Sequence, residues 1–198
     1  MIDIKNTKTL ICGIQGSGKT ELGKHLVQEC FKKSCWYFLN LDDLKKMKNK
    51  RVLKVRAIKR DFNELNRLCA KIIELGKKKQ IQCFVIDEAD ILIPKTVEKL
   101  QQYPFMHDIF VNHRHYNLCI IFMTRRPQDL NPLVVESCEH KFIYALETSD
   151  NILRKMKSID SNLPDLMRTL KKDNHDFIYK KLGEPPILMK PIKLKEKP

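Results

Sequence analysis

The stretch "LICGIQGSGKTEL", residues 10–22, places three glycines, a lysine and a threonine directly behind a short apolar run. Residues 13–20, "GIQGSGKT", fit the pattern G-x-x-x-x-G-K-[ST] without mismatch, and they lie between an expected strand and an expected helix, as a P-loop requires. Glycines allow successive backbone N–H groups to point at one phosphate, and the helix N-terminus adds a partial positive charge. The stretch therefore predicts a nucleotide site in an α/β domain.

Two residues of this loop have defined roles in phosphate binding. Lys19 is expected to reach the β- and γ-phosphates of ATP, and the Thr20 hydroxyl is expected to take one position on Mg²⁺. The predicted nucleotide-binding residues are Gly13, Gln15, Gly16, Ser17, Gly18, Lys19, Thr20 and Glu21.

A second motif, "IQCFVIDEAD", covers residues 81–90. Its continuous apolar run predicts a strand buried on both faces, which ends at the carboxyl edge where open α/β sheets bind ligands. Asp87 is expected to hold Mg²⁺ through water, and Glu88 to polarise the water that attacks the γ-phosphate. Because a kinase must exclude water, a carboxylate beside the metal-binding aspartate favours hydrolysis.

Short apolar runs alternate with helical periods, a pattern that predicts a mostly parallel central sheet flanked by helices. We expect one domain over residues 1–183 and a tail rich in lysine and proline over 184–198, in which residues 187–189 could pair at a sheet edge. Strands are predicted near 8–13, 35–40, 52–56, 81–87, 118–124, 139–146 and 175–180, and helices over 18–30, 61–76, 105–116, 149–158 and 164–171.

Composition restricts the classes of partner and compartment. The chain has 198 residues, and its 38 Lys and Arg against 24 Asp and Glu give a net charge of +14, which favours a polyanionic partner. Seven cysteines form no C-x-x-C pair, and most lie in apolar runs, as is typical of buried reduced thiols. Without an apolar run of membrane-spanning length or a signal-peptide core, the expected protein is soluble and cytoplasmic.

The stretch "NHRHYNLCIIFMTRRPQDLNPLVVESCEHKFIYAL", residues 112–146, resembles the FtsK/HerA superfamily of DNA-pumping ATPases. That resemblance implies a RecA/ASCE-like P-loop NTPase fold over roughly residues 8–160. It also implies that Arg114 is an arginine finger for a neighbouring subunit, that Thr124 is a polar sensor, and that the subunits form a hexameric ring. Where the family commonly has a sensor glutamine, this chain has Arg125, whose full charge could stabilise the γ-phosphate directly.

The small size of the chain is similar to that of the compact genome-packaging ATPases of membrane-containing archaeal viruses. The resemblance therefore implies an ATP- and Mg²⁺-dependent translocase of double-stranded DNA in the host cytoplasm or on the virion, with a capsid or membrane protein as partner. The "HRHYN" stretch, residues 113–117, also resembles the zonula-occludens-toxin-like ATPases that filamentous phages use in virion export. The export ATPases typically carry a membrane segment, and no such segment is visible in this sequence. We therefore rank packaging above export.

Two other classes of function remain open. A P-loop kinase for a nucleotide or small metabolite would also begin with strand, P-loop and helix, but Glu88 and the lack of an arginine-rich lid count against it. A nucleotide-dependent assembly factor would bind a capsid or membrane protein without pumping DNA. Hydrolysis that double-stranded DNA stimulates would separate the translocase from both.

Overall fold

The computed structural model describes residues 2–39, 52–57 and 60–191, which build an eight-stranded sheet in the order β3-β2-β4-β5-β1-β6-β7-β8. The strands from β3 to β6 in this order pair in parallel. β7 pairs antiparallel with β6, and β8 pairs antiparallel with β7. This arrangement confirms the predicted mostly parallel sheet. The strands are β1 (Lys8–Cys12), β2 (Ser34–Phe38), β3 (Val52–Arg56), β4 (Cys83–Ile86), β5 (Cys119–Thr124), β6 (His140–Ile143), β7 (Phe177–Lys181) and β8 (Ile187–Met189).

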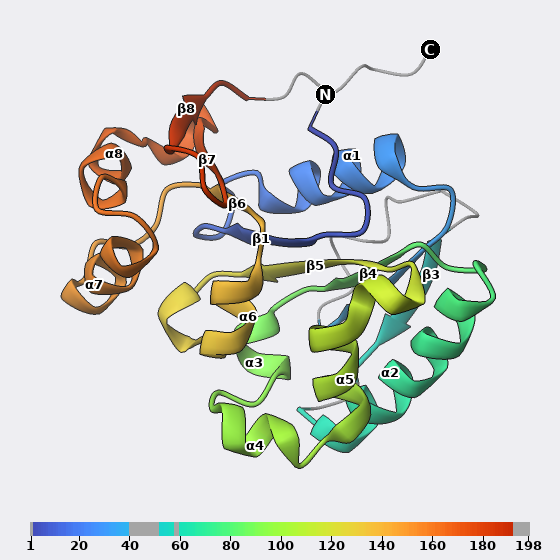
Figure 1. The fold of residues 1–198 in the computed structure, drawn as a ribbon. Coiled ribbons are helices and arrows are strands. Elements are labelled where there is room, and N and C mark those ends of the chain that lie inside the picture. Colours follow the sequence, from blue (N-terminus) through green and yellow to red (C-terminus); the bar gives the residue numbers. More distant parts are fainter. Residues whose placement is uncertain (1, 40–51, 58–59, 192–198) are drawn as a thin grey trace.

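Helices cover both faces of this sheet, with α1 on one face and α2 and α5 on the other (Figure 1). Among the described residues, no helix combines the length and apolar composition that crossing a lipid bilayer requires. The helices are α1 (Lys19–Cys30), α2 (Phe62–Lys77), α3 (Ala89–Leu92), α4 (Val97–Gln101), α5 (Pro104–Asn112), α6 (Pro132–Ser137), α7 (Asp150–Ile159) and α8 (Leu163–Thr169), with 3-10 turns at His113–Tyr116, Pro127–Asp129 and Lys172–Asn174.

Each face of the sheet has its own apolar core. Phe84 and Phe122 pack with Phe110 of α5 on one face, and Val85 packs with Leu26 of α1 on the other. The central strands β1, β2, β4 and β5 are buried along their whole length, which explains why β4 and most of β5 appear in the sequence as continuous apolar runs. Six of the seven cysteines are buried and free, as predicted.

Several elements end earlier than the sequence predicts. The strand expected over 139–146 ends at Ile143; of the two residues that follow, Tyr144 still bonds to the last residue of β1, and Ala145 bonds to the P-loop. Tyr144 N donates to Cys12 O at 2.8 Å, and Ile14 N donates to Ala145 O at 2.9 Å. The helix expected over 105–116 is α-helical only to Asn112. Residue 40, the end of another predicted strand, lies outside the described residues.

The helix start at Asp61 and the edge strand in the tail agree with the predictions. Asp61 Oδ1 accepts from Asn63 N at 2.8 Å and from Glu64 N at 3.3 Å, so Asp61 caps α2 at the residue where the predicted helix begins. β8 pairs with β7, which confirms the expected pairing of residues 187–189 at a sheet edge. The last seven residues of the predicted tail, 192–198, lie outside the described part of the chain.

Candidate nucleotide site

The P-loop lies between β1 and α1 and depends on its glycines for its shape. Gly16 and Gly18 have φ angles of +78° and +102°, in the left-handed region that glycine adopts without steric cost. A Cβ atom on Gly13 would lie 2.6 Å from Ser17 Oγ and 2.6 Å from Tyr144 Cβ. A side chain at any of these positions would therefore distort the loop.

Polar groups of the loop fit an anion. Among the described residues, the backbone N–H groups of Gln15, Gly16 and Gly18 have no acceptor, and the buried Ser17 Oγ atom has no hydrogen-bond partner. Buried or clustered donors without partners are rare in folded proteins unless a ligand or water satisfies them. These donors, at the N-terminus of the twelve-residue helix α1, fit the phosphates of a nucleotide.

Lys19 lies against the inside of the loop. Its Nζ atom donates to Ile14 O at 2.8 Å, and only 8% of the residue is exposed. Burial lowers the pKa of Lys19, while the nearby charge of Asp87 opposes that shift. An ammonium group that has lost part of its water gains by pairing with phosphate oxygens, so this placement fits the predicted role.

β4 ends in two carboxylates at the same edge of the sheet. Asp87 N donates to Tyr37 O at 2.9 Å, which extends the β2–β4 pairing, and Asp87 Oδ1 accepts from Glu88 N at 2.9 Å. Glu88 has φ and ψ angles of +53° and +43°. This left-handed conformation costs a non-glycine residue about 1–3 kcal/mol, and such conformations cluster at functional sites.

Arg125 joins the P-loop to the end of β4. Its guanidinium contacts Glu88 Oε1 at 3.2 Å and Gln15 Oε1 at 3.4 Å. The side chain of Arg125 is 46% exposed, whereas that of Glu88 is 19% exposed. In this structure, therefore, the residue that replaces the family's glutamine holds the carboxylate that we expect to activate water.

Thr124 has a partner that the sequence analysis did not anticipate. Its hydroxyl donates to Asp90 Oδ1 at 2.6 Å and accepts from Arg126 N at 3.0 Å, and both Thr124 and Asp90 are buried. Asp90 is the third acidic residue of "DEAD", and it is the feature of the sequence that could have indicated this contact. The Thr124 hydroxyl thus links β5 to α3, and it could sense a phosphate only if the bond to Asp90 opened.

Thr20 and Asp87 bring a hydroxyl and a carboxylate to this edge, which are oxygen ligands of the type that Mg²⁺ prefers. Their chemistry fits the predicted metal position. Glu21, the last residue of the predicted set, accepts a bond from Lys24 Nζ at 2.7 Å on the surface of α1. Its carboxylate is thereby engaged within the helix.

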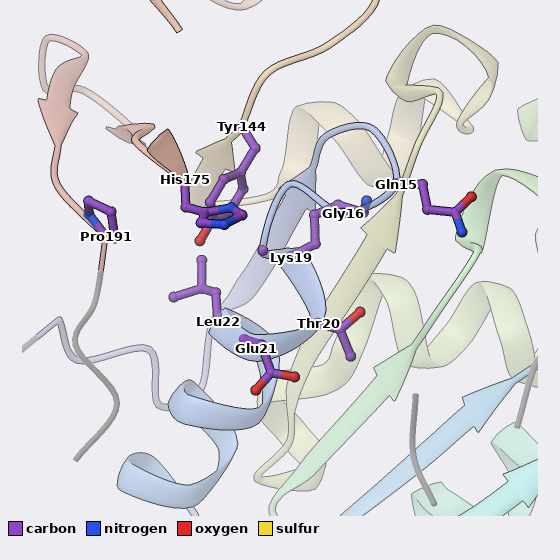
Figure 2. A pocket seen from close by; sticks show the side chains of 10 residues that line it. Gln15, Gly16, Lys19, Thr20, Glu21, Leu22, Tyr144, His175 and Pro191 are labelled. Carbon is purple, nitrogen blue, oxygen red and sulfur yellow. The ribbon is translucent and has the colours of Figure 1, made fainter. Parts of the chain in front are cut away.

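The loop lies between two unlike hollows. One has a volume of about 340 Å³, and all the described residues that line it are charged except Ile91; they include Glu88, Asp90 and Arg125. The other, of about 460 Å³, lies on the side of Tyr144 and His175, while the Gln15 side chain points away from these rings (Figure 2). Neither Tyr144 nor His175 was predicted from the sequence; the feature that could have indicated them is that each lies at or near one end of a predicted strand at the carboxyl edge of the sheet.

Arg114 is not part of this constellation. It lies before β5 at the amino edge of the sheet, where its Nη2 atom pairs with Glu139 Oε1 at 2.9 Å and its Nε atom donates to Asn6 O at 3.3 Å. Asn6 precedes β1 and Gly13 follows it, so at ~3.3 Å per residue the two edges are roughly 20 Å apart. Arg114 therefore cannot reach a phosphate on the P-loop of its own chain.

Comparison with known proteins assigns the chain to a family. The sequence model described as zonular occludens toxin (Zot) matches residues 9–172, well over half of the chain. The chain belongs to the Zot family. The Zot match includes the P-loop, the Asp87–Glu88 pair and Arg114, and it confirms the resemblance that the "HRHYN" stretch indicated. No curated protein sequence matches the chain.

Solved structures show which fold this Zot-family chain has. The genome packaging NTPase B204 from Sulfolobus turreted icosahedral virus 2, in complex with ATP-γS, superposes with a TM-score of 0.80 at 21% identity, covering 94% of this chain and 98% of that chain. B204 of Sulfolobus turreted icosahedral virus, a DNA-packaging ATPase, gives 0.83 at 20% identity, with 96% and 99% covered. The pCW3 conjugation coupling protein TcpA gives 0.63 at 13% identity, with 94% and 60% covered. These matches confirm the predicted P-loop NTPase fold.

Proposed function

We propose that this protein hydrolyses ATP and uses the energy to translocate double-stranded DNA, as the motor that packages a viral genome. One observation carries the hydrolysis: the Glu88 carboxylate lies beside Asp87 and is joined to the P-loop through Arg125 and Gln15. The DNA substrate is supported by the fold, which matches B204 over nearly the full length of both chains, and by the net charge of +14. A packaging motor would work in the cytoplasm of an infected host cell.

The residues at the carboxyl edge divide into binding and catalysis. Lys19 and the N–H groups of the loop bind the β- and γ-phosphates. Mg²⁺, held by Thr20 and by Asp87 through water, would neutralise phosphate charge and make the γ-phosphate easier to attack. Glu88 orients the attacking water and accepts its proton.

Arg125 must change partner for this reaction to proceed. While its guanidinium pairs with Glu88, that carboxylate is not free to accept a proton from water. A bound γ-phosphate offers Arg125 more negative charge than one carboxylate does. Arg125 therefore moves to the phosphate, stabilises it and releases Glu88, while Thr124 holds the end of β5 through Asp90.

Arg114 acts on a second copy of the chain, because its own P-loop is roughly 20 Å away across the sheet. Its side chain is 63% exposed, so it can extend toward a neighbour once it leaves Glu139. Head-to-tail contact between one chain's amino edge and the next chain's carboxyl edge closes into a ring, which we take to be a hexamer by resemblance.

DNA-stimulated hydrolysis tests the proposal. The full chain, with its oligomeric mass measured in the same buffer, should hydrolyse ATP faster when long duplex DNA is added at low salt. Lys19→Ala serves as the control for contaminating ATPases. A rate that duplex DNA leaves unchanged, in a ring confirmed to be assembled, would contradict the translocase.

The Zot family match supports a second function, in which the ATPase acts in virion assembly and export. Such a protein would require a coat or membrane protein as its activator. Hydrolysis that stays low with DNA and rises with a capsid or membrane protein of the same virus would favour this alternative over packaging.

A further inference from the structure

The hollow of about 460 Å³ beside the P-loop continues from the phosphate site. Loop residues form one wall of it, and Leu22, Tyr144, His175 and Pro191 form the rest. Figure 2 shows the rings of Tyr144 and His175 next to one another, close to Leu22 of helix α1. Its volume lies within the range of ~300–1,000 Å³ that is usual for small-molecule sites.

The two hollows on either side of the loop differ in a way that orients a bound nucleotide. The described residues that line the hollow at Glu88 and Arg125 are almost all charged, and none of them is aromatic. The hollow at Tyr144 and His175 offers two rings, a leucine and a proline. The γ-phosphate end therefore belongs on the Glu88 side, and the apolar faces of a base belong on the side of the rings.

Both rings lie close to the loop. A Cβ atom on Gly18 would lie 3.4 Å from Tyr144 Cε1 and 3.7 Å from His175 Nδ1. Tyr144 is buried and packs on Phe177 with ring centroids 5.2 Å apart. His175 is exposed and has a φ of +53°, a left-handed conformation in which histidine is enriched among non-glycine residues. Tyr144 thus forms a fixed floor, and the His175 imidazole is available to a ligand.

The C-terminal hairpin completes this wall. β8 pairs with β7, and Lys190 Nζ contacts Asp176 Oδ2 at 3.1 Å. Each member of this ion pair is next in sequence to a residue of the hollow, Asp176 to His175 and Lys190 to Pro191. The pair therefore links the two segments that carry the exposed wall residues His175 and Pro191.

We propose that this hollow seats the nucleoside of the bound nucleotide, with the base stacked on the His175 imidazole and enclosed by Leu22 and Pro191. The inference rests on the proposed function, since the P-loop must hold the phosphates. Because stacking uses the face of a base, we expect this site to bind ADP and GDP with similar affinity. Pro191, two residues after the end of β8, thereby has a role in nucleotide binding.

Calorimetric titration with ADP and with pyrophosphate tests the proposal, because neither ligand is hydrolysed by an ATPase. His175→Asn removes the ring and suits the left-handed backbone. It should weaken ADP binding about tenfold, equivalent to about 1.4 kcal/mol, and leave pyrophosphate binding unchanged. His175→Tyr retains a ring and should retain ADP affinity. The matched control is His107→Ala, in helix α5 on the opposite face of the sheet.

Each result has a defined meaning. Equal weakening of ADP and pyrophosphate in His175→Asn would place its effect on the loop and overturn the inference, as would wild-type protein that binds ADP no tighter than pyrophosphate. Wild-type protein that binds neither ligand would contradict the proposed function instead. If His175→Asn does not fold, Lys190→Ala replaces it: loss of the ion pair should weaken ADP binding about two- to fivefold and spare pyrophosphate.

Discussion

The two edges of the parallel sheet both carry charged residues, but they hold them in different ways. At the carboxyl edge, Arg125 and Glu88 pair with each other, and both line a hollow that a ligand can enter. At the amino edge, the protein itself satisfies the charges: Lys8 Nζ donates to Phe110 O at 2.9 Å, and Arg114 contacts Asn6 O and Glu139. The carboxyl edge is thus arranged for a ligand, and the amino edge for internal contacts.

Arg114 is the residue that could break this contrast between the two edges of the sheet. Its contacts are those of a structural residue, yet most of its side chain is exposed. If it is a finger, the amino edge of one chain completes the carboxyl edge of another. If it is structural, every catalytic group comes from one chain.

The largest expected effect therefore belongs to Arg114→Ala, which should lower the ATP turnover rate by about 10³ because a finger contributes 10³–10⁵. Mixing Arg114→Ala with Glu88→Gln subunits should restore part of the activity, since one interface in a mixed ring combines an intact Glu88 with an intact Arg114. Steady-state ATPase assays on exchanged mixtures measure this. Glu139→Gln is the control: it removes the ion pair, and it should reduce activity equally only if Arg114 is structural.

At the carboxyl edge, Lys19→Ala and Glu88→Gln should separate binding from hydrolysis. Lys19→Ala removes the ammonium that contacts the phosphates, and it should abolish measurable ATP binding. Glu88→Gln should keep binding and lower the turnover rate by about 10², the lower end of what a general base contributes. Nucleotide titration and single-turnover assays give the two quantities. The assigned roles are wrong if both variants lose binding to the same extent.

The imidazole of His113 reports how well the amino edge excludes water. Burial, together with the positive charges of Lys8 and Arg114, lowers the pKa of His113 from 6.5 to about 4. Between these pH values the unfolded chain binds a proton that the folded chain does not. The free energy of unfolding should therefore fall as the pH drops from 6.5 toward 4, by up to roughly 3 kcal/mol.

Urea unfolding at pH 4.5 and 7.5 measures this dependence. The wild-type protein should lose more stability than His113→Gln between these values, and His107→Ala should behave like the wild type. Equal losses in the wild type and in His113→Gln would show that the His113 imidazole is not held neutral at the amino edge.

The fold was largely predictable because its determinants are local. Buried parallel strands such as β4 require continuous apolar runs, and the P-loop requires glycines at fixed spacing. Element ends were less predictable. The residues after Ile143 have strand-like sequence, yet only Tyr144 still bonds to β1, and the next residue, Ala145, accepts a bond from Ile14 N of the P-loop instead.

The site was predictable only where a motif carries its chemistry. Lys19, Asp87 and Glu88 lie in motifs, whereas Tyr144, His175 and Pro191 come together only through the long-range pairing of β6, β7 and β8. The partners of Arg125 and Thr124 were equally hidden. Glu88 and Asp90 reach them through a left-handed turn at Glu88, a conformation that sequence patterns do not favour for glutamate.

The smallest expected effect concerns the Arg125–Glu88 pair within the carboxyl edge. Because Glu88 competes with the γ-phosphate for Arg125, Glu88→Gln should bind a non-hydrolysable ATP analogue about two- to fivefold more tightly, the worth of a partly exposed ion pair. ADP affinity should not change, since ADP lacks the phosphate for which Glu88 competes. Calorimetric titration of both ligands resolves a change of this size.

Removal of the Glu88 charge could strengthen ATP binding by lowering repulsion alone, without any part played by Arg125. The double variant separates the two causes, because in an Arg125→Gln background no guanidinium remains to be released. The gain from Glu88→Gln should then disappear if Arg125 is the group that changes partner. A gain of the same size in both backgrounds would mean that Arg125 and Glu88 act independently, and that the ion pair does not control when Glu88 becomes free.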